Sequence, residues 1–274
     1  MSSRHEFVTC ALWALTALAT TGCAAVFPEL PTHFSKAPEG VSLDPPPPDD
    51  LHFLQVTSGK VPPKTRDGRA WGQVLGSLPD PFAKVFINDQ EVFRTDPEGD
   101  TLEPRWKGSP AGNFKVGVGD KIEIQLWDKS PLNDSPIGVR EITLSADMMS
   151  GEDILFDMSG GGAVTLKVAD ARPIWGVGFW FELRNDAAYV SRLVAGSPAA
   201  RGGILPGDRI ASIDGAPVEK MSLAEVRSKL ASFPTAGYDL ALVHKDGGAV
   251  SVKLKEGPIY PAFADYSSLP IKPE

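Results

Sequence analysis

The clearest pattern in the chain is an alternation of apolar and polar residues. Between Lys121 and Trp127, the apolar residues Ile122, Ile124 and Leu126 alternate with polar ones. This period of two is typical of a strand with one buried face. Further short β-type runs lie at residues 51–56, 83–87, 154–156 and 164–168. Because no convincing amphipathic helix lies between them, we expect an all-β sandwich over residues 51–168.

After residue 170, strands alternate with two short helices. Ser197 followed by Pro198 is typical of a helix start, with serine as the cap and proline at the first helical position. Ser222 and Glu225 have the spacing of a capping box. The helix predicted after that box has apolar residues on one face, namely Leu223, Val226 and Leu230. We expect a small α+β unit at residues 170–256 and a Pro-containing tail at residues 257–274.

The N-terminal residues have the features of an export signal. An uncharged apolar stretch runs from Phe7 to about Ala19 and is followed by small residues up to Cys23. A short apolar core of this kind indicates a secretory signal at residues 1–22. The alternative is an uncleaved anchor, because residues 7–28 carry no charge and a bilayer span needs ~20 apolar residues.

The small residues before Cys23 resemble the lipobox of bacterial lipoproteins, a family whose signal is cut before a cysteine that is then lipidated. Thr20 departs from the leucine usual there. Ala24 is not the aspartate that holds such lipoproteins at the inner membrane, so the resemblance implies an outer-membrane lipoprotein facing the periplasm or the surface. Cys10 and Cys23 are the two cysteines of the chain, so the exported domains would contain no disulfide.

Residues 23–50 have the composition of a tether. They contain four consecutive prolines from Pro45 to Pro48, followed by two aspartates. Such a segment cannot bury enough apolar surface to fold by itself. We expect it to be semi-extended, at ~3 Å per residue where it is polyproline-like.

Charge and histidine placement narrow the function. The 274 residues carry a net charge of −8, which argues against nucleic acid as a partner because phosphate binding needs clustered lysine and arginine. The four histidines are scattered, and there is no HExxH, GxSxG or Cys–His arrangement. We therefore expect no catalytic residues and a protein that is not an enzyme.

An ordered set of motifs in the C-terminal unit resembles a PDZ domain. Its parts are Gly176-Val177-Gly178-Phe179 before a strand, Gly196-Ser197-Pro198, Leu205-Pro206-Gly207-Asp208, Ile213-Asp214-Gly215 and the capped helix. The resemblance covers residues 170–256 and implies a small, partly open barrel. It also implies a groove between the strand after the glycine loop and the helix at 222–232. A peptide can add to such a strand edge as a further strand.

The resemblance assigns roles to particular residues. Successive backbone N–H groups of a Gly-x-Gly loop can point into one concavity that suits a terminal carboxylate, and Arg172 would add positive charge there. Leu223, where some members have histidine, implies an apolar preference two residues before the ligand's end. The predicted peptide-binding residues are Arg172, Gly176, Val177, Gly178, Phe179, Phe181, Leu223 and Leu230. The alternative is that the glycines only shape a turn and the apolar residues are core. The sequence leaves open whether the groove is empty or filled by the chain's own tail.

Residues 51–168 resemble a C2 domain. The motifs are Pro79-Asp80-Pro81-Phe82, Leu126-Trp127-Asp128 and Asn133-Asp134 before Ile137-Gly138. By position the family's calcium ligands would be Asp67, Asp80, Asp128 and Asp134, and Ser130 stands where a further carboxylate is usual. Calcium takes six to eight oxygens, so a weak site is the expectation. The alternative is a scaffold with aspartates in its turns.

Three functions follow from these features. The leading hypothesis is an envelope-tethered adaptor that binds peptide segments or C-termini of partner proteins through the PDZ-like groove. The second is a calcium-dependent structural or surface-attachment protein. The third is an accessory subunit that presents substrates to a separate envelope protease.

Overall fold

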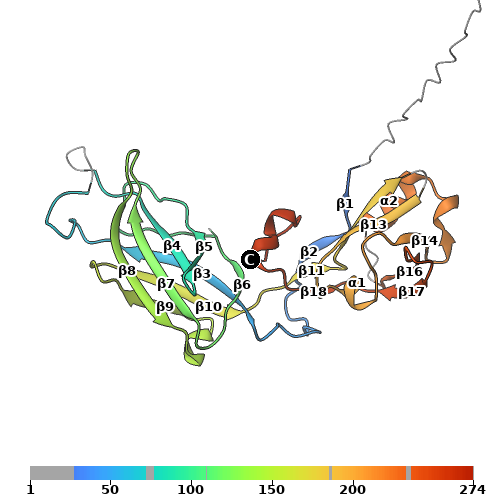
Figure 1. Ribbon diagram of the computed structural model, residues 1–274, viewed down its shortest axis with the longest axis horizontal. Helices are drawn as coiled ribbons and strands as arrows, with labels where there is room; N and C mark the ends of the chain where they lie inside the picture. The colour runs from blue at the N-terminus through green and yellow to red at the C-terminus, as the bar shows by residue number, and fades with distance from the viewer. Residues whose placement is uncertain (1–27, 72–76, 109, 185–186, 233–235, 274) are drawn as a thin grey trace, which may run out of the picture.

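The structure is a computed structural model and describes residues 28–71, 77–108, 110–184, 187–232 and 236–273. Figure 1 shows two lobes, a sandwich and a C-terminal lobe, with the C-terminal segment between them. The predicted signal peptide, Cys23 and most of the alternative anchor lie outside the described residues. No helix within these ranges is long and apolar enough to cross a bilayer.

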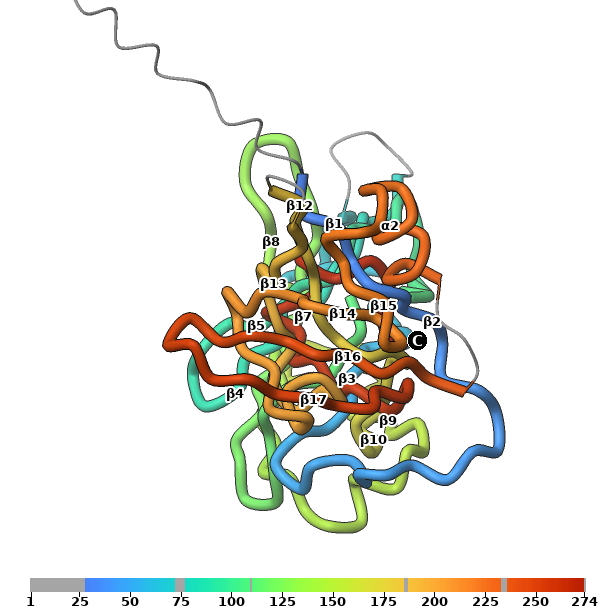
Figure 2. Tube along the Cα trace, turned by 90° about the vertical axis from the view of Figure 1, so that its right-hand side faces the viewer, coloured from blue at the N-terminus to red at the C-terminus, as the bar shows by residue number. Residues whose placement is uncertain are grey.

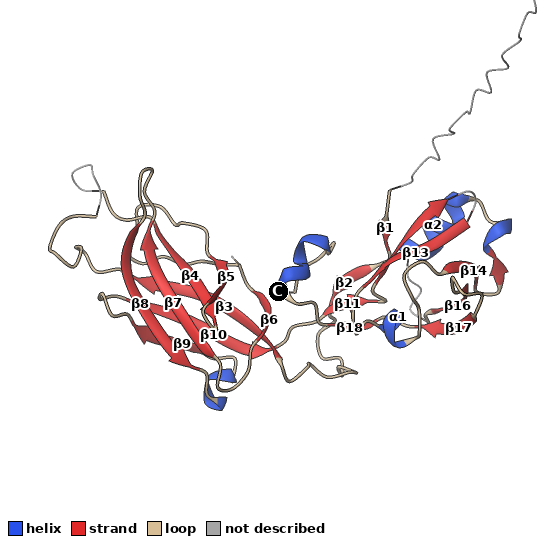
Figure 3. Ribbon diagram, in the orientation of Figure 1, coloured by secondary structure: helices blue, strands red, loops and turns tan. Residues whose placement is uncertain are grey.

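The sandwich consists of two four-stranded antiparallel sheets (Figure 3). One has the order β6 (Gly112–Lys115), β3 (Leu51–Lys60), β10 (Ala163–Asp170) and β9 (Asp153–Asp157). The other has the order β5 (Gln90–Arg94), β4 (Pro81–Ile87), β7 (Lys121–Asp128) and β8 (Ser135–Thr143). A single turn of 3-10 helix, η1 (Ala146–Met149), lies between β8 and β9. The predicted all-β sandwich is therefore confirmed.

Alternating burial explains why these strands form a sandwich. Ile122, Ile124 and Leu126 of β7 are completely buried, and the polar residues between them are only partly covered. The three apolar side chains belong to one core cluster together with Leu54 of β3 and Leu166 of β10 in the opposite sheet. Burying one apolar face of each sheet against the other is what stabilises two-layer β structures.

The C-terminal lobe combines a large and a small sheet. The large sheet has the order β1 (Leu30–Pro31), β12 (Phe179–Arg184), β13 (Ala187–Leu193), β14 (Arg209–Ile213), β16 (Tyr238–Val243) and β17 (Ala249–Leu254), and β15 (Ala216–Pro217) pairs with β14. The small sheet has the order β18 (Gly257–Ile259), β11 (Ile174–Gly176) and β2 (Phe34–Lys36). Across the described residues no sheet closes into a barrel.

Two α-helices and a 3-10 turn complete this lobe. They are α1 (Pro198–Arg201), η2 (Val218–Lys220) and α2 (Leu223–Ala231). The predicted helix start at Ser197 is confirmed, because its side chain accepts a hydrogen bond from the backbone N–H of Ala200. The predicted capping box between Ser222 and Glu225 is also present. Both helices therefore begin where the sequence predicts.

The predicted tether at residues 23–50 is not a separate extended segment. Its described part contributes β1 to the large sheet and β2 to the small sheet of the C-terminal lobe. The polyproline run is also held, because the Tyr260 hydroxyl donates a hydrogen bond to the carbonyl oxygen of Pro45 at 3.0 Å. Composition misled here because short strands gain their stability from partners far away in the sequence rather than from their own residues.

The C-terminal tail connects the two lobes. After β18, the 3-10 helix η3 (Phe263–Ser268) packs on the sandwich. The Phe263 ring stacks on Phe114 of β6, with 4.8 Å between ring centroids. The Tyr266 ring lies so close to Gly112 that a Cβ atom there would come within 2.6 Å of its Cε2 atom. The predicted loose tail is therefore an ordered part of the junction between the lobes.

Candidate functional site

The glycine loop connects β11 to β12 in the C-terminal lobe. Gly178 has a φ angle of +83°, which glycine adopts without strain. A Cβ atom at Gly178 would lie 2.3 Å from the Cβ of Ser197, so a side chain would not fit. The Gly178 carbonyl accepts a hydrogen bond from the backbone N–H of Val194 at 2.9 Å. The loop is thus fixed against α1 and β13 by both its shape and its hydrogen bonds.

Helix α2 forms the opposite side of this region. The Ser222 side chain accepts a hydrogen bond from the Glu225 N–H at 3.2 Å, and the Glu225 carboxylate accepts one from the Ser222 N–H at 2.7 Å. Hydrogen bonds from Ser222 lower the pKa of Glu225. Leu230 is completely buried, whereas Leu223 in the first turn is only partly buried. Of these two predicted groove residues, Leu223 therefore keeps exposed surface.

The predicted apolar pocket is largely part of the lobe's own core. Val177, Phe179 and Phe181 are completely buried and belong to the same cluster as Leu230. Their packing fixes the backbone of the loop and of β12. Leu223 packs against this cluster from the side.

The edge of β12 beside the groove is occupied by the chain itself. Strand β1 pairs antiparallel with β12, so that Leu30 lies opposite Phe181 and Pro31 opposite Trp180. The Thr32 N–H donates to the Phe179 carbonyl at 3.1 Å, and the Thr32 hydroxyl donates to the same oxygen at 2.6 Å. Figure 2 shows β1 next to β12, on the side of the lobe where α2 lies. The occupant comes from the N-terminal segment rather than from the C-terminal tail.

Arg172 lies at the junction of the two lobes and has different neighbours from those predicted. Its guanidinium stacks on the ring of Phe53 in β3, 3.9 Å from the ring centroid. Its backbone N–H donates to the side-chain oxygen of Asn113 at 2.8 Å. Burial of the guanidinium lowers the pKa of Arg172. This side chain therefore packs against the sandwich, and the glycine loop lacks the positive charge that we expected from it.

The four predicted calcium ligands do not form one cluster. Hydrogen bonds from Arg69 and Thr65 lower the pKa of Asp67 to about 2, and Arg69 also forms an ion pair with it. Asp134 pairs with Lys129 at 3.1 Å. Among the described residues there is no group of three or more His, Cys, Asp or Glu side chains that could hold a metal ion.

Asp80 and Asp128 lie next to each other at one end of the sandwich. The Asp80 N–H donates to the Asp128 carboxylate at 2.8 Å, and Asp80 in turn accepts from the Asp100 N–H at 2.7 Å. Burial, with smaller contributions from the charges of Asp80 and Asp134, raises the pKa of Asp128. Asp100 was not predicted, because its place beside Asp80 depends on a loop with a positive φ angle.

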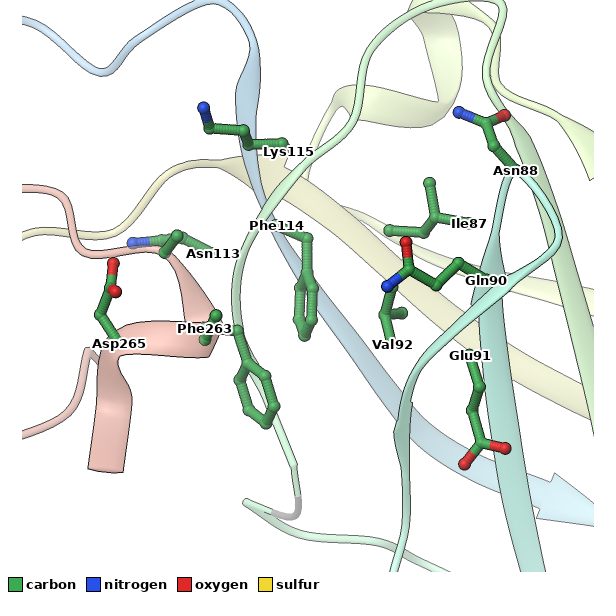
Figure 4. A pocket seen from close by; sticks show the side chains of 12 residues that line it. Ile87, Asn88, Gln90, Glu91, Val92, Asn113, Phe114, Lys115, Phe263 and Asp265 are labelled. Atoms are coloured by element: carbon green, nitrogen blue, oxygen red, sulfur yellow. The ribbon is translucent and has the colours of Figure 1, made fainter. Parts of the chain in front are cut away.

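A pocket lies where the tail meets the sandwich. Figure 4 shows Phe114 and Phe263 on one side of it and Gln90 and Val92 on the other. Sequence reasoning did not predict this pocket, since it depends on the docking of η3. Its lining mixes apolar and charged side chains without a buried reactive group.

Comparisons with known proteins agree with the two lobes. A family model described as C2 domain matches residues 54–158. A second one, described as PDZ domain, matches residues 189–235. The chain has a C2 domain followed by a PDZ-like domain. PDZ domains suggest binding of protein or peptide, and C2 domains suggest binding of lipid or Ca²⁺. No curated protein was found to match the sequence.

Several solved structures resemble the C2 domain. A structure described as that of a C2 domain is 16% identical, with a TM-score of 0.35, and covers 43% of this chain and 96% of its own. A C2 domain of plant Extended Synaptotagmin 1 is 17% identical, with a TM-score of 0.35, and covers 44% and 94%. A calcium-bound pair of C2 domains from Extended-Synaptotagmin 2 is 18% identical, with a TM-score of 0.35, and covers 50% and 48%.

Proposed function

We propose that this protein is an envelope-tethered adaptor that binds extended segments of partner proteins in the groove of its PDZ-like domain. The observation that carries the proposal is the pairing of β1 with β12. An extended segment from outside the domain's own fold lies along the strand edge, with Thr32 almost completely buried beside the glycine loop. Strand addition of this kind is a recurring mode of peptide recognition.

The groove has one wall that can set specificity. Main-chain hydrogen bonds to a strand edge supply affinity for almost any sequence, so selectivity comes from side-chain contacts. Leu223 is partly buried and packs against the same core cluster as Leu30 of β1. It supports an apolar preference in the ligand at the position that Leu30 occupies.

The described histidines support a binding role rather than catalysis. His33 contacts the Glu256 carboxylate, His52 hydrogen-bonds the Val116 carbonyl, and His244 contacts the almost completely buried Asp208. Each side chain thus fastens one part of the fold to another. The envelope location belongs to the proposal as well, supported by the signal-like residues 1–22 and the lipobox-like cysteine that follows them.

A peptide array tests the proposed function. The full chain is screened in its wild-type form and as Leu223→Lys, with Ala224→Lys on the exposed side of the same helix turn as the control. We expect Leu223→Lys to change the preference at the Leu30-like position from apolar to acidic and Ala224→Lys to leave it unchanged. The proposal fails if no peptide binds the wild type or a chain whose β1 has been weakened.

Calcium binding by the C2 domain is a second candidate function, favoured by one observation. The pKa of Asp128 is raised mainly by burial and also by the charges of Asp80 and Asp134, which shows that these carboxylates repel one another. A cation would relieve that repulsion, provided that Asp134 leaves Lys129. Calorimetry and melting in millimolar calcium, with Asp128→Asn compared against the exposed Asp157→Asn, test it. No heat and no melting shift in the wild type would exclude it.

A further inference from the structure

Residues 29–34 pass completely through the groove. They pair with β12 through Leu30 and Pro31 and hydrogen-bond to Phe179 through Thr32. The chain then continues into β2, where Phe34 lies opposite Gly176 of β11. Because the segment does not end at the glycine loop, the groove holds it as an internal stretch of chain, without a terminal carboxylate.

The glycine loop is shaped for this passage. A Cβ atom at Gly176 would lie 2.7 Å from the carbonyl oxygen of His33, a distance that real Cβ contacts do not show. Glycine at this position therefore provides room for a chain that crosses the loop. In contrast, the loop glycine Gly178 is required by its own backbone conformation and by Ser197.

Side chains hold the segment at both ends. At the first end, Glu29 accepts hydrogen bonds from the Ser191 hydroxyl at 2.7 Å and from Arg192 at 2.8 Å. The Arg192 guanidinium lies over the Trp180 ring, 4.2 Å from its centroid. At the other end, the Phe34 ring packs on Trp180, with 5.1 Å between centroids. These contacts lie outside the backbone pairing and depend on the sequence of the occupant.

We propose that residues 29–34 are a ligand held in cis, and that partner proteins displace them with an internal extended segment of similar chemistry. The pattern is an acidic residue, an aliphatic residue, proline and a hydroxyl residue, as in Glu29-Leu30-Pro31-Thr32. This inference rests on the proposed function, names its ligand class and makes the groove autoinhibited. Strand β1 pairs through only two residues, so a competing strand with more pairs can replace it.

Competition within one chain has a predictable size. A ligand joined to its own groove by a short linker acts at an effective concentration of ~1 mM. If the free peptide has a Kd of ~0.1 mM, about one groove in ten is open, and the apparent affinity for an external peptide falls about tenfold. Weakening β1 without changing the groove should therefore tighten external binding about tenfold.

The test uses the full chain and a labelled peptide of residues 27–36 with both ends blocked. Leu30→Asp weakens β1, and Val41→Asp is the matched control, because it places the same change at an exposed position outside β1 and β2. We expect Leu30→Asp to bind the peptide about tenfold more tightly than the wild type or Val41→Asp. Circular dichroism shows whether each variant is folded.

The possible results separate the two proposals. Equal affinity in the wild type and Leu30→Asp would overturn the occupant held in cis and leave the adaptor function standing. Binding to Leu30→Asp only by peptides with a free carboxylate would overturn the internal mode. If no peptide of any kind binds Leu30→Asp, both proposals fail.

A charge exchange provides an independent test if Leu30→Asp does not fold. Arg192→Glu replaces the partner of Glu29 at a partly exposed position. In this variant we expect a probe carrying Glu29→Arg to bind more tightly than the native probe, with the opposite order in the wild type. An unchanged order in both proteins would show that external peptides do not lie where residues 29–34 lie.

Discussion

Asn113 organises the junction between the two lobes. It is completely buried, and its side-chain amide donates to the carbonyl oxygens of Arg172 at 2.8 Å and Pro261 at 3.1 Å. Its side-chain oxygen accepts from the Arg172 N–H, and its own N–H donates to the Tyr266 hydroxyl at 2.8 Å. One side chain of the C2 domain therefore satisfies backbone groups from the segment that enters the PDZ-like domain and from the segment that leaves it.

Tyr266 gives this junction a pH dependence. Burial raises the pKa of Tyr266 from 10.0 to about 12. Between these values the unfolded state loses the phenolic proton more readily than the folded state, so stability falls as the pH rises through that window. We expect denaturant unfolding to show a smaller loss from pH 10 to about 12 in Tyr266→Phe than in the wild type. Tyr189→Phe, on β13 away from the junction, should behave like the wild type; a parallel decline of all three proteins would contradict the prediction.

Residue patterns predicted side-chain roles only where partners are close in the sequence. The Ser222–Glu225 box was predictable because both groups lie within one helical turn. Arg172 was assigned to the glycine loop, whereas its ring partner Phe53 comes from the other domain. Asp67 was assigned to calcium, but Arg69 two residues away takes its charge. Long-range partners of this kind cannot be read from a single sequence.

Elements were predictable where one face of a strand or helix is buried. The alternation in β7 and the caps of α1 and α2 all appear in the structure at the predicted residues. The strands β1 and β2 were missed because they are two and three residues long and are flanked by prolines in a tether-like composition. Their pairing depends on β11 and β12, about 140 residues further along the chain.

Helix α2 depends on its capping box. Ser222→Ala removes the acceptor for the Glu225 N–H, and loss of a serine cap costs about 1 kcal/mol. We expect the free energy of unfolding of the PDZ-like domain to fall by that amount, measured by denaturant titration. Ser228→Ala, at an exposed position within the same helix, should instead leave stability unchanged or raise it slightly, because alanine is the better helix former. Equal losses in both variants would rule out the capping argument.

The whole molecule is arranged differently from the tether expected for residues 23–50. That tether, at ~3 Å per residue, would have separated the folded domains from the membrane by roughly 80 Å. In the structure the PDZ-like domain binds the chain already at Leu30, seven residues after the predicted lipid-bearing Cys23. Seven extended residues reach about 25 Å, so an anchor at Cys23 would keep the PDZ-like domain, rather than the C2 domain, close to the bilayer.

Energy transfer from the protein to a membrane dye tests this arrangement. A fluorophore is placed on the PDZ-like domain at Ala224→Cys or on the far loop of the C2 domain at Leu132→Cys, which is 80% exposed. We expect stronger transfer from Ala224→Cys, because its domain is held by β1 beside the anchor. Adding Leu30→Asp should release β1 and reduce the difference between the two labels. Stronger transfer from Leu132→Cys in the unmodified background would instead place the C2 domain at the membrane, and the occupied groove would then not determine how the protein is held.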